Sequence, residues 1–93
     1  MKRTLLKSKA FIRSAKKYIK KSPNMIEDIK ETLELLSEDA FHPSLKTHKL
    51  KGILEGSWAC SVGYDLRIVF EFVLHQDAEA ILLEDIGTHD DVY

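Results

Sequence analysis

The first half of the chain carries apolar side chains at the spacing of two α-helices. The first helix is predicted over about residues 9–21, with Ser8 as its N-cap. Its apolar positions are three or four residues apart, as in an amphipathic helix: Phe11, Ala15, Tyr18 and Ile19. The short, partly apolar segment 2–7 in front of it is predicted to be a strand.

A second helix is predicted over about residues 23–37, with Ser22 as N-cap and Pro23 at the first helical position. Its apolar stripe consists of Ile26, Ile29, Leu33 and Leu36. Two helices with so short a link form an antiparallel hairpin. Because the first helix is basic and the second acidic, we expect their facing edges to attract each other.

The second half of the chain has the pattern of a β-meander. Strands are predicted over residues 57–62, 66–74 and 80–86, which are separated by turn residues. Residues 38–55 are expected to be irregular. The sequence therefore predicts one α+β domain over residues 1–93, in which the helix hairpin packs on a mainly antiparallel four-stranded sheet.

The composition is that of an ordinary globular domain, with 44% hydrophobic and 31% charged residues. No apolar run approaches the ~20 residues that span a membrane, and the basic start lacks the apolar segment of a signal peptide. A single cysteine, Cys60, excludes an internal disulfide and a cysteine-rich metal site. We therefore expect a cytoplasmic protein without a membrane partner.

The charge is distributed unevenly along the chain. Residues 1–21 hold nine Lys or Arg and no acid, whereas the remaining residues hold fifteen acids and five bases. A segment of charge +9 is typical of a surface that binds polyanions; the alternative is a solvated helix face. The candidate RNA- or phosphate-binding residues in it are Lys9, Arg13, Lys16, Lys17 and Lys20.

A second set of candidates lies in the irregular segment and at the strand ends. His48 is surrounded by Lys46, Lys49 and Lys51, and Asp65 opens the long central strand. Arg67 follows two residues later, on the same face of that strand. The last strand is followed by His89 and, four residues further on, by Tyr93. Whether these side chains meet depends on the strand order, which the sequence does not fix. If the last strand is parallel to the Asp65 end, or lies diagonally beside it, we expect them to line one groove.

This set has the groups that metal-free RNA cleavage needs. The ribose 2′-OH attacks the neighbouring phosphorus while one imidazole removes its proton and another protonates the leaving 5′-oxygen. His48 and His89 suit these two roles in either order, and Arg67 or Lys51 can supply the cation that steadies the transition state. No metal or other cofactor is expected, since the acidic pairs lack EF-hand spacing. The alternative for each residue is an ordinary surface or turn position.

Four motifs in this order resemble the YafQ branch of the RelE/ParE superfamily of bacterial toxins, over nearly the whole chain. They are His48-Lys49-Leu50-Lys51-Gly52, Gly56-Ser57-Trp58-Ala59-Cys60, Asp65-Leu66-Arg67-Ile68-Val69-Phe70 and Ile86-Gly87-Thr88-His89-Asp90-Asp91-Val92-Tyr93. The resemblance implies the toxin of a type II toxin–antitoxin pair, and many such toxins cut mRNA in the ribosomal A site without a metal. It implies catalytic roles for the residues that match the family's acting ones, His48, Asp65, His89 and Tyr93.

The resemblance also implies partners. The toxin would bind a small antitoxin protein, and it would meet operator DNA only through that antitoxin. The ribosome and its mRNA would be the targets. Tyr93 would stack on a base of the message.

Two positions depart from the family's pattern. Well-known members carry a further His where this chain has Ser61, and an Arg where it has Asp85. Arg67 can replace the missing cation. Three alternatives stay open: a gyrase poison of the same fold, as in ParE-like relatives, an inactive relative that still binds its antitoxin, and an RNA-binding domain that acts through its basic helix alone.

Overall fold

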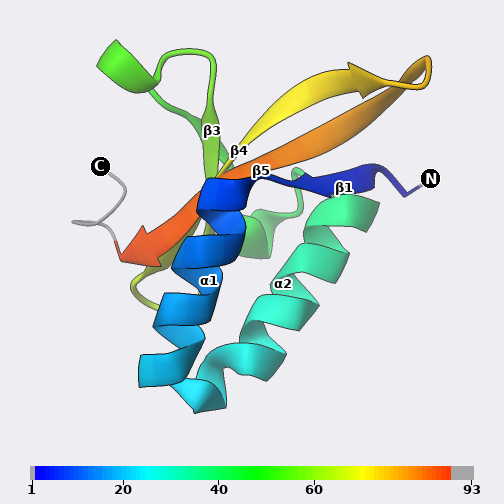
Figure 1. Cartoon of the computed structure of the whole chain (residues 1–93). Helices are drawn as coiled ribbons and strands as arrows, with labels where there is room; N and C mark the ends of the chain where they lie inside the picture. Colours follow the sequence, from blue (N-terminus) through cyan, green and yellow to red (C-terminus); the bar gives the residue numbers. More distant parts are fainter. Residues whose placement is uncertain (1, 89–93) are drawn as a thin grey trace.

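The computed structural model describes residues 2–88, except for the side chain of Ile53. Within these residues, two helices and five strands make up an α+β fold (Figure 1). The helices are α1 (Lys9–Lys21) and α2 (Ile26–Glu38), and the strands are β1 (Thr4–Lys7), β2 (His48–Lys49), β3 (Trp58–Val62), β4 (Leu66–His75) and β5 (Ala78–Thr88). Three short 3₁₀ turns complete the chain: η1 (Pro23–Met25), η2 (Pro43–Leu45) and η3 (Gly52–Leu54).

The sheet has the order β1-β5-β4-β3-β2, in which β1 is parallel to β5 and the other neighbours are antiparallel. The α+β class is confirmed, but the prediction of four mainly antiparallel strands was wrong, because the sheet has five strands and is mixed. The fifth strand, β2, has two residues, which is too short for a hydrophobic period to reveal. Because β2 is defined by the pairing of its backbone with β3, it can be recognised only in the tertiary structure.

The start of α1 follows the prediction. The Ser8 hydroxyl accepts a hydrogen bond from the Phe11 N–H at 3.0 Å and donates one to the Glu84 carbonyl, also at 3.0 Å. It therefore caps the helix and attaches it to β5 at the same time. The predicted start of the second helix at Pro23 was three residues early, because residues 23–25 form η1 and the Ser22 side chain makes no capping hydrogen bond.

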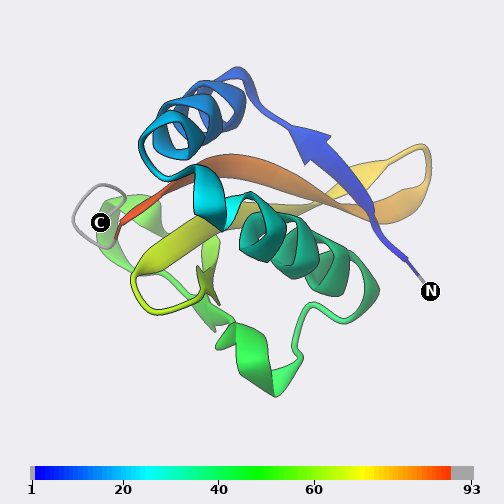
Figure 2. The same cartoon turned by 90° about the horizontal axis from the view of Figure 1, so that it is seen from below.

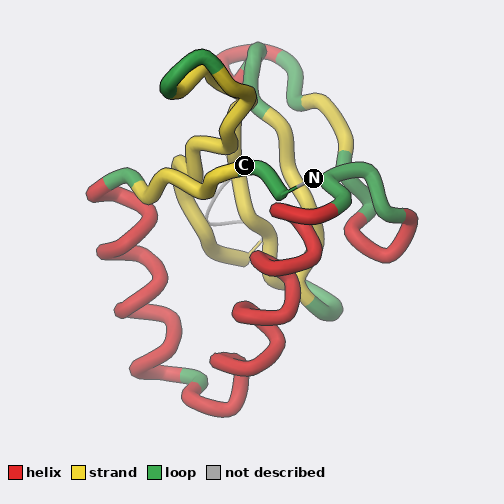
Figure 3. Tube along the Cα trace, turned by 90° about the vertical axis from the view of Figure 1, so that its right-hand side faces the viewer, coloured by secondary structure: helices red, strands yellow, loops and turns green. Residues whose placement is uncertain are grey.

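The two helices meet at η1 and pack on one face of the sheet, with α1 across β5 (Figures 1 and 3). Seen from below, α1 lies beside β5 (Figure 2). The core joins apolar residues from both helices to the facing side of the sheet. Its largest fully buried side chains are Phe70, Leu36, Leu45, Leu66, Ile68, Ile81 and Leu83. Since β4 and β5 supply most of them, these two strands form the frame on which the remaining elements pack.

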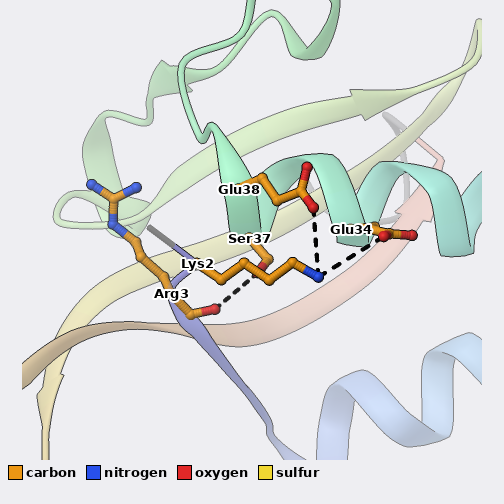
Figure 4. A network of polar contacts seen from close by, with 5 residues as sticks. All are labelled: Lys2, Arg3, Glu34, Ser37 and Glu38. Atoms are coloured by element: carbon orange, nitrogen blue, oxygen red, sulfur yellow. Dashed lines mark hydrogen bonds and ion pairs between the residues drawn. The ribbon is translucent and has the colours of Figure 1, made fainter.

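The segment before β1 holds the end of α2 (Figure 4). The backbone N–H of Arg3 donates to the Ser37 carbonyl at 2.9 Å, and the Ser37 hydroxyl donates to the Arg3 carbonyl at 3.0 Å. The Lys2 ammonium lies 3.5 Å from a Glu38 carboxylate oxygen and 3.9 Å from one of Glu34. Glu34 and Glu38 on α2 are thus paired with Lys2, and no ion pair joins α1 to α2 within residues 2–88. The attraction expected between the helix edges therefore stays a prediction.

Neither helix is long and apolar enough to span a membrane, as far as the described part of the chain is concerned.

Candidate functional site

The predicted site residues depend on where the ends of β4 and β5 lie. The two strands are antiparallel, with Leu66 opposite Thr88 and Arg67 opposite Gly87. The beginning of β4 and the end of β5 therefore lie at the same edge of the sheet. The parallel or diagonal arrangement considered from the sequence does not occur, because β5 is antiparallel to β4 and its end meets the start of β4 directly.

Residues that lie opposite each other on neighbouring strands share a face of the sheet, and this places His48, Ser61 and Arg67 on one face. Ser61 on β3 is opposite Arg67 on β4, which is opposite Gly87 on β5. His48 on β2 is opposite Ala59, two residues before Ser61 and on the same face. His48 thus lies roughly 7 Å along the sheet from the Ser61–Arg67 pair. This face is the one opposite the helices, because the alternate residues Cys60, Val62 and Ile68 point into the core.

A hollow of about 460 Å³ opens on this face. Its lining combines two predicted cations and one predicted acid with the β3–β4 turn: Lys46, Ser61, Gly63, Tyr64, Asp65 and Arg67. We call it the catalytic groove, after the candidate catalytic residues that line it. It brings together Lys46, Asp65 and Arg67, three of the residues that the sequence singled out, and it also includes Ser61, one of the two positions that depart from the motif pattern. Tyr64 was not predicted as a site residue, although its place beside Asp65 in the sequence was a signal.

Arg67 is half-buried and oriented by the turn that precedes it. Its Nη1 donates to the carbonyl of Tyr64 at 3.3 Å and to that of Leu66 at 3.2 Å. Two backbone carbonyls thus hold the guanidinium against the groove. Asp65 is exposed at its rim.

His48 is oriented by its own loop. Its Nδ1 lies 2.9 Å from the Lys46 carbonyl, which can only accept, so Nδ1 carries the proton. In the neutral ring the other nitrogen, Nε2, is then the acceptor and the atom that can take up a proton. Lys46 itself has a left-handed backbone with φ 52°. Such a conformation is uncommon outside glycine and is often found where a functional side chain is aimed.

The other two lysines of this loop lie elsewhere. Lys49 is opposite Trp58, and its ammonium is 5.4 Å from the centre of that indole ring. Because it follows His48 directly in a strand, it points to the other face of the sheet. Lys51 is exposed and lines a second hollow, of about 590 Å³. The other residues that line this hollow belong to the segment 49–58, which contains η3. The structure therefore joins Lys46, but neither Lys49 nor Lys51, to the catalytic groove.

The basic residues of α1 form one exposed stripe. Lys9, Arg13, Lys16, Lys17 and Lys20 are all exposed, at helical spacing and on the side away from buried Phe11. One of them reaches the end of β5: Lys17 lines a hollow of about 360 Å³ with Lys21, Tyr18 and the backbone around Gly87. This hollow is separate from the catalytic groove, which none of the five stripe residues lines.

Asp85 and Cys60 bear on which reactions the site can carry out. Asp85 accepts a hydrogen bond from the Ile86 N–H at 2.9 Å, so its carboxylate is engaged by its own backbone. Cys60 is fully buried, and this burial raises the pKa of its thiol from 9.0 to about 12, against the opposing effect of the Arg67 charge. A thiol with so high a pKa stays protonated and unreactive at neutral pH.

Two of the predicted catalytic residues, His89 and Tyr93, lie outside the described residues. No three His, Cys, Asp or Glu side chains gather at metal-binding distance within residues 2–88.

The chain matches one family over nearly its whole length. Residues 3–93 match the family described as the YafQ bacterial toxins of type II toxin–antitoxin systems. A comparison with curated protein sequences finds no match.

Solved structures show the same fold. A YafQ mutant from E. coli superposes with a TM-score of 0.80 at 19% identity, and 98% of each chain is covered. YafQ in a DinJ–YafQ complex from E. coli gives a TM-score of 0.77 at 19% identity, over 100% of this chain and 99% of that one. A YoeB/ParE toxin from Agrobacterium tumefaciens gives 0.75 at 16% identity, over 92% and 98%. These likenesses confirm the RelE-like fold, and the family match confirms the resemblance that the motifs indicated: the chain belongs to the YafQ family of toxins of bacterial type II toxin–antitoxin systems.

Proposed function

We propose that this toxin is an endoribonuclease that cuts mRNA in the ribosomal A site by metal-independent acid–base chemistry. The observation that carries the proposal is the catalytic groove, where Lys46, Asp65 and Arg67 share one hollow with the turn before β4. His48 lies on the same face, and His89 directly follows Thr88, the last residue of β5, in the sequence. Two imidazoles beside fixed cations are the groups that cleavage through the ribose 2′-OH requires.

In the proposed reaction the RNA strand supplies its own nucleophile. The 2′-OH attacks the adjacent phosphorus as one imidazole removes its proton, and the bond to the 5′-oxygen breaks as the other imidazole protonates that oxygen. The products are a 2′,3′-cyclic phosphate and a 5′-hydroxyl. His48 and His89 fill these roles in an order that we leave open.

The remaining residues position the RNA. Arg67 and Lys46 face the phosphate in the groove, where fixed cations stabilise charge that develops in the transition state. Asp65 orients an imidazole or the ribose, and Tyr93 stacks on a base of the codon. Lys49 and Lys51 contact phosphates further along the strand, from the other side of the loop. The basic stripe of α1 lies against ribosomal RNA.

We further propose that a small antitoxin protein binds this chain and blocks its activity. Relatives of the same fold have been solved with partners of this kind: YafQ with DinJ from E. coli, and YoeB with YefM from Staphylococcus aureus. The antitoxin would also carry the pair to operator DNA. The toxin would act in the cytoplasm, where ribosomes translate.

The test is to induce the chain alone in a bacterium, beside a His89→Gln variant, and to map the 5′ ends of mRNA. We expect growth arrest, inhibited translation and new cuts at codon boundaries, all lost in the variant. Purified ribosomes carrying a defined mRNA should reproduce the cuts, and chelation of metal ions should not prevent them. Arrest without cuts would contradict the nuclease assignment.

A gyrase-binding toxin is the second candidate, and a specific observation favours it. Ser61 and Asp85 stand where a His and an Arg would assist phosphodiester cleavage, and the Asp85 carboxylate is engaged by its own backbone. A supercoiling assay with the purified protein separates the two functions. Inhibition of gyrase together with uncut mRNA would establish the second function and exclude the first.

A further inference from the structure

The side chain of Tyr64 is 98% exposed, more than any other large hydrophobic residue that the structure describes. It lies in the turn between β3 and β4, directly before Asp65. Its ring has no stacking partner and its hydroxyl no hydrogen bond within residues 2–88. A fully solvated aromatic ring adds nothing to the core, and both its apolar face and its hydroxyl are accessible to a ligand.

The backbone that carries this ring is held firmly. Its carbonyl accepts a hydrogen bond from Arg67 Nη1 at 3.3 Å, and the residues that flank the turn, Val62 and Leu66, are paired across β3 and β4. Gly63, at the start of the turn, takes the left-handed conformation, with φ 61°. The ring thus projects from a turn that strand pairing and a hydrogen bond hold in place.

The ring also stands at the groove where the proposed chemistry occurs. Tyr64 lines the same hollow as Lys46, Asp65 and Arg67. Cations beside an exposed aromatic ring are the combination that binds single-stranded nucleic acid, because the cations hold phosphates while the ring stacks on a base. Arg67 links the two functions, since the guanidinium that faces the phosphate also holds the carbonyl of the residue that bears the ring.

We propose that Tyr64 stacks on an unpaired nucleobase of the mRNA whose phosphate lies against Arg67 and Lys46, and that it thereby contributes to codon preference. The proposal rests on the proposed endoribonuclease function and extends it to a second base-binding position, distinct from that of Tyr93. A rigid stacking surface beside the cleaved phosphate favours nucleotides that stack well, above all purines.

The experiment uses ribosomes programmed with mRNA that carries the fluorescent base 2-aminopurine at one of the three A-site positions. The toxin added to them carries His89→Gln, so that the message stays intact, and stacking is read as quenching of the fluorescence. We expect quenching at one position that Tyr64→Phe preserves and Tyr64→Ala abolishes. The same Ala variant should bind the ribosomes about 5- to 150-fold more weakly, the range seen when a stacking ring is removed.

Leu74→Ala is the matched control. It removes another exposed large side chain, 78% exposed near the far end of β4, without touching the groove. It should leave both quenching and binding unchanged. Because the Tyr64 ring is solvated, all variants should unfold at the same temperature as the parent chain.

Cleavage by the chain with intact His89, on unlabelled message, separates the two proposals. Equal quenching and equal cut sites in the parent and Tyr64→Ala would overturn the stacking proposal and leave the nuclease in place. Absence of quenching in the parent at all three positions would overturn it as well. Tyr64-dependent quenching by a toxin that never cuts would support stacking and refute the nuclease.

Discussion

Leu66, the first residue of β4, lies directly opposite Thr88, the last residue of β5. This pairing brings together two motifs that are more than twenty positions apart in the sequence: the Gly63–Asp65 turn with Arg67, and the segment that leads into His89. Adding β2 to the other side of β3 places His48 on the same face. One register between two antiparallel strands thus creates the edge at which the proposed chemistry occurs.

Replacement of Arg67 by Gln is expected to slow mRNA cleavage by about 100-fold or more, because it removes a fixed cation that faces developing negative charge. Arg67→Lys should restore part of the rate, since it keeps the charge but loses the fork that two carbonyls orient. Single-turnover cleavage on programmed ribosomes measures both. An unchanged rate in Arg67→Gln would mean that another residue supplies the cation.

Lys46 and Lys49 form a matched pair for testing the orientation of the loop. Lys46 lines the catalytic groove, whereas the Lys49 ammonium lies over the Trp58 ring on the other face. Lys46→Gln should therefore reduce the cleavage rate clearly more than Lys49→Gln does, although both remove one positive charge. Equal losses would indicate that the loop acts only through its total charge.

The basic stripe on α1 should make ribosome binding dependent on salt. Each phosphate contact that is lost lowers the slope of log K against log salt concentration by about 0.7–0.9. The double variant Lys16→Gln and Lys20→Gln should reduce this slope while the chemical step, measured at saturating ribosomes, stays the same. Lys30→Gln on α2 is the control, since Lys30 is also exposed but is not part of the stripe. A slope that is unchanged by the double variant would leave the stripe as a solvated helix face.

Ser8→Ala should lower the free energy of unfolding by about 1 kcal/mol, because it removes the cap of α1 as well as the hydrogen bond to Glu84. Ser22 provides the control, as it also precedes a helical turn but makes no side-chain capping bond. Ser22→Ala should change stability by less than about 0.5 kcal/mol. Urea denaturation followed by circular dichroism compares the two, and similar losses would rule out a special role for the cap.

The thiol of Cys60 should make stability decrease at alkaline pH. Its pKa is about 12 in the folded chain against 9.0 for an exposed thiol, so above pH 9 the unfolded state loses a proton that the folded state keeps. The stabilisation is complete below pH 9 and is lost as pH rises toward 12, by at most about 1.4 kcal/mol per pH unit. Denaturation curves of the parent and Cys60→Ala between pH 7 and 10.5 isolate the contribution of the thiol to the free energy of unfolding. Rapid alkylation of the folded protein at pH 8 would show that the thiol is exposed after all.

The sequence by itself determined the two helices, four of the five strands and the family, because these depend on local patterns. A period of 3.6 residues marks a helix wherever it packs, and the Ser8 cap involves only its neighbours three positions away. The family motifs were likewise local, and they correctly indicated the toxin fold.

Only the tertiary structure decided which of the marked residues meet. A two-residue strand such as β2 has no period of its own and exists through its pairing with β3. That pairing places His48 on the same face of the sheet as the groove and Lys49 on the opposite face, although the two residues are adjacent in the sequence. In the same way, Arg67 and Tyr64 became parts of one groove through strand register and a hydrogen bond to a backbone carbonyl. Such long-range pairing depends on the whole chain packing at once, and so no local pattern could have predicted it.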